Sequence, residues 1–131
     1  MAAVTGTVSS VFDFQSPIGP ERTTAGAEIV HCKILVTYTG TYAAADDSST
    51  ANVHTAIANS RQDGKTYALV SACWAGFGDE AGAKIGAKTV ATSTNTMTAT
   101  LTTADASTEH ADGAMGAWHR GVCFAVTLTA T

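Results

Sequence analysis

The segment EIVHCKILVTYT, residues 28–39, constrains the fold most, because apolar side chains recur in it at every second position. One face of this segment is wholly apolar and holds Val30, Cys32, Ile34, Val36 and Tyr38. β-Branched residues are frequent here, and they favour an extended backbone. The pattern predicts a central strand of a sheet with one face on a core.

The rest of the chain is a series of short segments separated by glycine-containing turns. Further strands are predicted over residues 66–75, 84–92, 95–103 and 118–129, and residues 4–12 are a first strand or an extended arm. Turns or loops are predicted over residues 76–82 and 104–117. The pattern indicates a mainly β fold, an antiparallel β-sandwich or flattened barrel of six to seven strands with one short α-helix.

The helix is predicted at about residues 49–61. Asp47 or Ser48 can cap its first turn, and Val53 and Ile57 lie four residues apart, so both can dock on the sheet. We expect one β-sandwich domain over residues 28–131, because 131 residues suit a single domain. Residues 1–27 are predicted to be an extended N-terminal arm and loop that orders on binding a neighbour.

Charge is scarce in this chain. Charged residues make up 14% of the sequence, against about 25% in a typical globular domain, so the surface is neutral. A neutral surface suits a chain packed against other chains. The 7 Lys and Arg residues are scattered and the net charge is −4, which argues against nucleic-acid binding. There is no apolar run long enough to span a membrane. The opening MAAVTGTVSS lacks a secretory signal, so we expect synthesis in the cytoplasm.

The stretch TSTNTMTATLTT, residues 92–103, places threonine at almost every second position. Its threonines are predicted to face outward, opposite Met97, Ala99 and Leu101. Two interpretations stay open, a solvated strand face or a contact face in an assembly. An edge strand usually carries lysine, proline or a bulge against unwanted pairing, and neither this segment nor the last strand, VTLTAT, does so. The candidate interface residues are Thr96, Thr98, Thr100 and Thr102, with Pro17, Ile18 and Pro20 of the arm.

No motif for catalysis, metal or cofactor binding is present, so we expect a non-enzymatic protein without cofactor. The candidate bases are His31, His54, His110 and His119, of which His31 in a strand and His54 in the helix are predicted to be structural or surface residues. Three distant cysteines, Cys32, Cys73 and Cys123, suit neither a disulfide framework nor a zinc site, and are predicted to be buried free thiols.

Two groups of residues could still bind a ligand. Residues 105–113 alternate acidic and hydroxyl side chains, which predicts either a weak cation site or recognition loop, or a solvated hairpin loop, since calcium-loop spacing is incomplete. The aromatic residues that could form a sugar-binding platform, if they are exposed, are Tyr42, Trp74, Phe77 and Trp118. The apolar neighbours of the two tryptophans favour core packing instead.

The chain resembles small virion structural proteins of tailed bacteriophages, especially capsid decoration or cement proteins. The residues that carry this resemblance are MAAVTGTVSS, HCKILVTYTGTYAAADD at 31–47, RQDGKTYAL at 61–69 and the Thr/Ala-rich second half. The resemblance implies a non-enzymatic homo-oligomer on the capsid surface. Such a protein would bind the outside of a major capsid protein shell, together with copies of itself, and stabilise the shell.

Other functions stay open beside this one. A phage tail-tube, connector or minor head protein would fit the same composition, and a tube subunit would form rings or tubes by itself. A carbohydrate-binding β-sandwich module would need Trp74 or Trp118 exposed. An enzyme would need a catalytic constellation that the sequence does not display.

Overall fold

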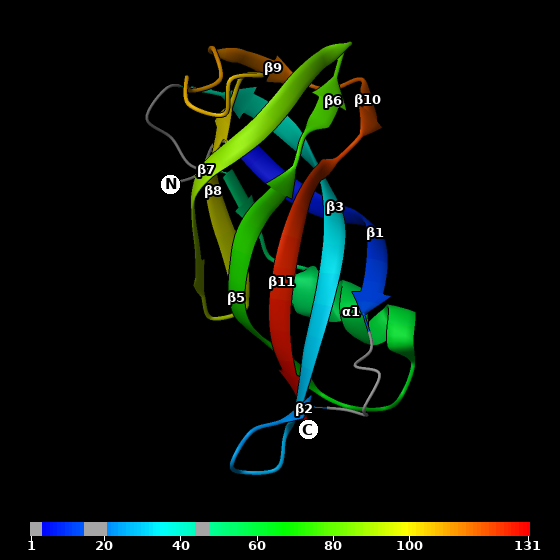
Figure 1. Cartoon of the computed structure of the whole chain (residues 1–131). Helices are drawn as coiled ribbons and strands as arrows, with labels where there is room; N and C mark the ends of the chain where they lie inside the picture. Colours follow the sequence, from blue (N-terminus) through cyan, green and yellow to red (C-terminus); the bar gives the residue numbers. More distant parts are fainter. Residues whose placement is uncertain (1–3, 15–20, 44–47) are drawn as a thin grey trace.

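The computed structural model describes residues 4–14, 21–43 and 48–131, which form eleven strands and one short helix (Figure 1). The strands are β1 (Val4–Phe14), β2 (Glu21–Arg22), β3 (Glu28–Tyr42), β4 (Ser48–Thr50), β5 (Tyr67–Gly76), β6 (Gly78–Glu80), β7 (Ala83–Ser93), β8 (Thr96–Thr102), β9 (Gly113–Met115), β10 (Trp118–Arg120) and β11 (Val122–Ala130). The helix is α1 (Val53–Arg61). The prediction of a mainly β fold with one short helix is confirmed.

The strands form one open sheet in the order β10-β6-β7-β8-β4-β1-β3-β11-β5, with β2 and β9 paired to β3. The sheet is mixed, because β1 and β4 run parallel. It curls until β5 approaches β7, and side chains bridge the gap between them. The Thr92 hydroxyl donates to the Val70 carbonyl at 3.1 Å, and the Leu69 N–H donates to Asn95 Oδ1 at 2.8 Å. The sheet is thus open and mixed, and the prediction of an antiparallel β-sandwich or flattened barrel of six to seven strands is wrong.

The additional strands are short and fall where the sequence predicts turns or a continuous strand. β6 lies inside the predicted turn 76–82, and β9 inside the predicted loop 104–117. The predicted strand 118–129 is divided into β10 and β11 at Gly121. A Cβ atom at Gly121 would lie 2.7 Å from the backbone nitrogen of Val36, so β3 passes too close for a side chain there.

The core lies on the concave side of the sheet, and β3 supplies its centre. The predicted apolar face of this strand is buried, with Ile34, Val36 and Tyr38 at 0% exposure. On β8, Met97, Ala99 and Leu101 face the same core, as predicted. β3 and β8 thus present alternate residues to the interior over most of their length, because successive side chains of a strand point to opposite faces.

β1 belongs to this sheet. Residues 4–12 are predicted as a first strand or an extended arm, and the strand is the correct alternative, since β1 pairs with β3 from Val4↔Gly40 to Phe14↔His31. Val4 is buried in the core with 1% exposure. The prediction of an arm that orders only on binding is thus wrong for these residues, because ladder bonds and core contacts already fix them. Pro17, Ile18 and Pro20 lie outside the described residues.

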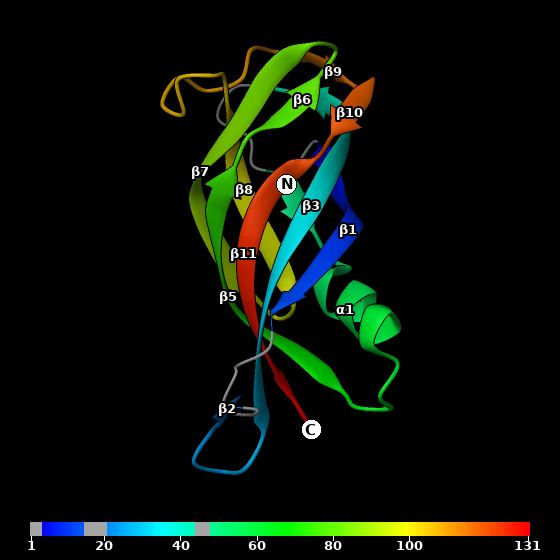
Figure 2. The same cartoon turned by 45° about the vertical axis from the view of Figure 1, so that its right-hand side comes forward.

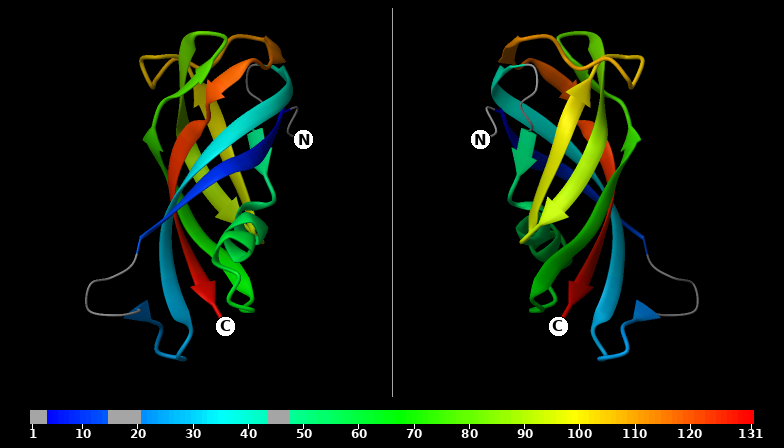
Figure 3. Two further views of the ribbon diagram at one scale, coloured as in Figure 1. Left: turned by 90° about the vertical axis from the view of Figure 1, so that its right-hand side faces the viewer. Right: turned by 90° about the vertical axis from the view of Figure 1, so that its left-hand side faces the viewer.

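The helix begins later than predicted. Ser48–Thr50, expected to open a helix over residues 49–61, form β4, which pairs with β1 on one side and with β8 on the other. α1 then begins at Val53, after an Asn52 that makes no side-chain capping bond. Its two buried residues, Val53 and Ile57, hold it on the concave side of the sheet, away from the β6–β10 strands (Figures 2 and 3). The described chain has no helix that is long and apolar enough to cross a membrane.

A polar cluster fastens α1 and β5 to the start of β3. Glu28 accepts hydrogen bonds from Arg61 Nη2 at 3.0 Å and from Lys65 Nζ at 2.7 Å. Asp63 accepts one from the Tyr67 hydroxyl at 2.6 Å. The Lys65 hydrogen bond lowers the pKa of Glu28, as does the charge of Arg61, although burial opposes both. This cluster closes one end of the molecule, which we call the α1 end.

Candidate functional site

The predicted threonine face on β8 does not lie at an edge of the sheet. β8 lies between β4 and β7 and pairs with both, for example through Thr98↔Ser49 and Thr98↔Ala91. Thr96, Thr98 and Thr100 are half-buried, and Thr102 is fully buried. The argument from an unguarded edge is therefore wrong for this strand. β11, which contains most of VTLTAT, is not an edge either, because it pairs with β3 and β5.

A different, almost uncharged surface covers the convex side of β1, β3, β11 and β5, and we call it the outer face. Figure 1 views this face from the front, with α1 behind the sheet. Its residues are Thr5, Thr7, Ser9, Phe12, Ile29, His31, Lys33, Leu35, Thr37, Thr39, Ala68, Val70, Ser71, Cys73, Ala125, Thr127 and Thr129. Lys33 is the one lysine, arginine or carboxylate among them.

The outer face is accessible and partly apolar. Phe12 and Val70 are both 52% exposed, and they are the large hydrophobic residues that the described chain leaves open to solvent. Cross-strand pairing aligns Phe12 with Lys33, then Ala125, then Cys73 in one row. Many of the remaining positions are threonine. The sequence missed this surface because its residues come from four separate segments, and because the bulges of β5 change which of its residues point outward.

The charged residues lie mainly at the two ends of the molecule. One group is the polar cluster around Glu28 at the α1 end. The other lies around β6, β7, β10 and the loop after β8, which together we call the β10 end (Figure 3). This distribution leaves the middle of the curled sheet almost neutral on its convex side.

The predicted cation or recognition loop at residues 105–113 begins with a turn that is held together by Asp105. Asp105 Oδ1 accepts hydrogen bonds from the backbone N–H groups of Ser107 and Thr108, at 2.9 and 2.8 Å. Its Oδ2 accepts the Thr108 hydroxyl at 2.6 Å. These bonds hold the pKa of Asp105 well below its usual value. Because the carboxylate is occupied in this way, the solvated-loop interpretation fits better than a cation site. The described residues include no group of three or more His, Cys, Asp or Glu placed to hold one metal ion.

Two contacts fasten this loop to the sheet. The Tyr42 hydroxyl donates to Glu109 Oε2 at 2.7 Å. His110 lies edge-on to the Tyr42 ring, with centroids 5.3 Å apart, and its Nε2 lies 3.5 Å from Glu80 Oε1. His110 therefore has a structural environment between β6 and the Tyr42 ring.

The cysteines differ in exposure. None of the three forms a disulfide within the described chain, and Cys32 and Cys123 are buried, as predicted. Cys73 is exposed, so the prediction of a third buried thiol is wrong. The register of β5 shifts against β11 on both sides of Cys73, between Thr127 and Leu128 and between Cys123 and Phe124. A bulge of this kind changes which residues of a strand point outward, so simple alternation from Tyr67 misplaces Cys73.

The four aromatic residues of the predicted platform do not gather. Tyr42 is buried at 0% exposure, and Trp118 packs against the core and donates from Nε1 to the Tyr38 carbonyl at 2.8 Å. Trp74 also packs against the core, so core packing of both tryptophans is confirmed. Phe77 stands edge-on to Trp74, with centroids 4.9 Å apart and an interplanar angle of 83°.

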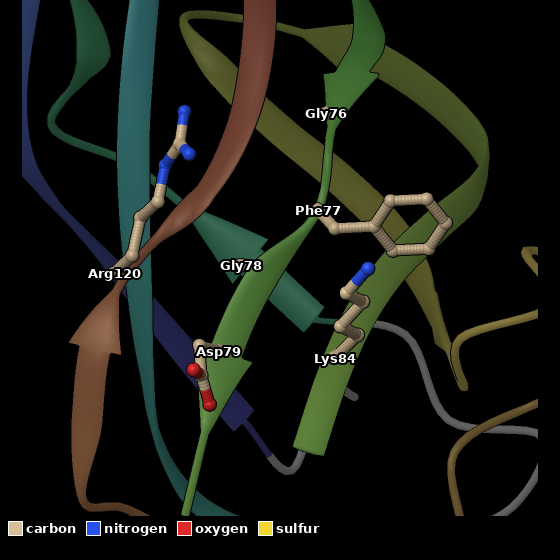
Figure 4. A pocket seen from close by; sticks show the side chains of 6 residues that line it. All are labelled: Gly76, Phe77, Gly78, Asp79, Lys84 and Arg120. Carbon is tan, nitrogen blue, oxygen red and sulfur yellow. The ribbon is translucent and has the colours of Figure 1, made fainter. Parts of the chain in front are cut away.

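A pocket of about 410 Å³ opens beside Phe77 at the β10 end (Figure 4). It is lined by Gly76, Phe77, Gly78, Asp79, Lys84 and Arg120. Figure 4 shows Phe77 and Lys84 on one side of the β5–β6 segment and Arg120 on the other. The sequence assigns this segment to a turn, and therefore missed the pocket, which depends on β6 pairing with both β7 and β10.

Glycine backbone and charged side chains line most of this pocket. A Cβ atom at Gly78 would lie 2.6 Å from the backbone nitrogen of Val122, so close packing requires glycine there. Asp79 lies directly opposite Lys84 on β7 and opposite Arg120 on β10. Lys84 and Arg120 are exposed, whereas Asp79 Oδ1 is buried without a hydrogen-bond partner.

No protein-family model matches the chain, and no curated protein and no solved structure is significantly similar to it.

Proposed function

We propose that this chain is a non-enzymatic structural protein of a virion, which binds the outside of a capsid shell as a decoration or cement subunit. In this role it bridges and stabilises major capsid protein subunits and associates with copies of itself. It is made in the host cytoplasm and reaches the capsid surface by assembly. The observation that carries the proposal is the outer face, in which Lys33 is the one lysine, arginine or carboxylate.

The chemistry of the outer face supports a protein partner. The solvated side of an antiparallel sheet is normally polar, and a soluble domain normally mixes charges of both signs across its surface. Here threonine, serine and alanine predominate, and Phe12 and Val70 are 52% exposed. Threonine presents a methyl group that packs against protein and a hydroxyl that can form a hydrogen bond. Charged residues are depleted in the core of protein interfaces in the same way.

The size of the outer face suits a specific contact. Four strands at their usual spacing, each with about nine residues, cover about 20 Å by 30 Å, or roughly 600 Å² in projection. A standard interface buries about 800 Å² of accessible surface per partner, which is larger than the flat projection of the same patch. Many copies held in a lattice reinforce one another, so each contact need not be tight.

The test is density-gradient sedimentation of a lysate from the native source, with mass spectrometry of each fraction. We expect the chain to travel with large particles at a copy number close to that of the major shell protein. A few copies per particle would favour a tail, connector or minor head protein instead. A chain that stays at the top of the gradient would overturn the virion proposal.

A matched pair of variants tests which surface makes the contact. Thr37→Lys places a charge on the outer face, and Thr98→Lys places the same charge on the predicted threonine face of β8. With shells that lack the native chain, we expect Thr37→Lys to lose most particle binding and Thr98→Lys to retain it. The reverse result would move the interface to β8. Thermal melting of both variants checks that each is folded.

A further inference from the structure

The loop between β8 and β9 is joined to three strands by two adjacent residues. Glu109 Oε2 accepts a hydrogen bond from the Tyr42 hydroxyl of β3 at 2.7 Å. His110 Nε2 lies 3.5 Å from Glu80 Oε1 of β6. The backbone N–H of His110 donates to the Leu101 carbonyl of β8 at 2.8 Å. The position of the loop on the sheet therefore depends on side chains that carry or exchange protons.

The two nitrogens of the His110 ring each face an acceptor. Nδ1 lies 2.6 Å from the Ala111 carbonyl oxygen, which can only accept a hydrogen bond, so Nδ1 carries a proton. In the neutral ring Nε2 is then an acceptor, and it faces a carboxylate oxygen of Glu80. Two acceptors attract each other only when a proton lies between them. The contact therefore requires one additional proton, which Nε2 and Oε1 share.

Burial couples this proton to the position of the loop. The side chains of His110 and Glu80 are 13% and 12% exposed, so water reaches neither freely. Glu80 Oε2 is buried without a hydrogen-bond partner, which leaves His110 as the group that compensates the carboxylate. A buried carboxylate that loses its compensating charge raises the free energy of the folded state. Loss of the shared proton therefore favours a conformation in which the loop moves away and water solvates both groups.

We propose that the His110–Glu80 contact is a pH-sensitive switch for the loop between β8 and β9. In mildly acidic solution the shared proton holds the loop on β6. As the pH rises the pair loses this proton and the loop is released, in the range between about pH 5 and 8 where a histidine side chain ordinarily changes charge. Because the two groups share one proton, the transition belongs to the pair. The switch does not depend on the assembly role, since it lies within one chain and away from the outer face.

Other ionisable side chains surround this pair. They are Tyr42 on β3, Asp79 on β6, Lys84 and Lys88 on β7, His119 and Arg120 on β10, and Asp105, Glu109 and Asp112 in the loop. Among them, His119 is the one whose residue type ordinarily changes charge between about pH 5 and 8. Trp118 lies directly opposite Glu80, so its neighbour His119 points to the other face of β10. His119 therefore serves as a control for the switch.

The experiment is amide hydrogen exchange of the full chain between about pH 5 and 8.5, with each rate divided by that of an unstructured peptide at the same pH. The His110 amide is the probe, because its bond to the Leu101 carbonyl joins the loop to β8. We expect its protection to fall about tenfold or more as the pH rises. The amides of Ser107 and Thr108 are an internal control, since Asp105 holds them within the loop and their protection should change little.

Two substitutions separate the switch from a general loosening of the fold. Glu80→Gln replaces the carboxylate by an amide that can donate to the neutral Nε2, so the His110 amide should stay protected across the whole pH range. His119→Gln removes the other histidine of this end and should retain the native transition. Amides of β3 show that each variant is folded. Constant protection of the His110 amide in the native chain, a transition that survives Glu80→Gln, or one that disappears in His119→Gln would each overturn the proposal.

Discussion

Replacing Glu28 by Gln should measurably destabilise the fold, because Glu28 joins three elements at the α1 end. Glu28 itself is 8% exposed, and its partner side chains, Arg61 and Lys65, are 16% and 36% exposed. The bond to Arg61 is shielded from water, and a charge-assisted bond of this kind contributes about 1.5–3 kcal/mol. The Lys65 pair is partly screened and adds about 0–1 kcal/mol.

Glutamine retains one acceptor oxygen, so part of this stabilisation survives the substitution. We therefore expect Glu28→Gln to lower the free energy of unfolding by about 2 kcal/mol, which for a domain of this size lowers Tm by about 6–10 °C. Chemical denaturation and thermal melting at pH 7 measure both quantities. A double-mutant cycle with Arg61→Gln separates their coupling from the individual effects.

The pH dependence of the free energy of unfolding tests whether the ionised Glu28 carboxylate is the source of this stabilisation. The folded protein holds the pKa of Glu28 below its ordinary value of 4.5, so ionised Glu28 stabilises the fold above that pH. This contribution is lost as the pH falls through the lowered pKa of the folded state. The difference in stability between the native chain and Glu28→Gln should therefore shrink below pH 4.5. A difference under about 0.5 kcal/mol at pH 7, or one that grows with acid, would refute the reasoning.

Three further substitutions or measurements test other parts of the fold. Ile57→Ala should cost about 2–5 kcal/mol and accelerate hydrogen exchange in α1 more than in β3, since the nine-residue helix has one other buried anchor; equal acceleration would contradict this. Gly121→Ala should reduce Tm strongly, because its Cβ would meet the β3 backbone at 2.7 Å; a native-like melting curve would show that the strands can separate. In the folded protein, Cys73 should react with a thiol reagent at once and the other two cysteines only on unfolding; three fast thiols would contradict the burial pattern.

The alternation of apolar residues in the sequence was sufficient to predict the long strands β3 and β8. In β3 and β8 every second residue is apolar over several positions, and the structure buries those residues. Turn residues and segment lengths were not sufficient to predict β4, β6 and β9, which have three residues each. A strand so short carries no periodicity of its own, and it forms because a longer neighbour offers a free backbone edge. The bulges of β5 escaped prediction for a related reason, because register is decided by the partner strand.

The outer face and the pocket at the β10 end likewise depend on strand pairing, which the sequence alone does not predict. Alternation along β1, β3 and β11, together with the bulges of β5, sends Thr, Ser and Ala outward, but only the order of these strands in the sheet joins the positions into one face. At the β10 end, a charged residue from each of three short or terminal stretches meets only because β6 pairs with both β7 and β10. The outer face and the pocket thus lie on different parts of the fold, and a charge added to one surface should leave the other unaffected.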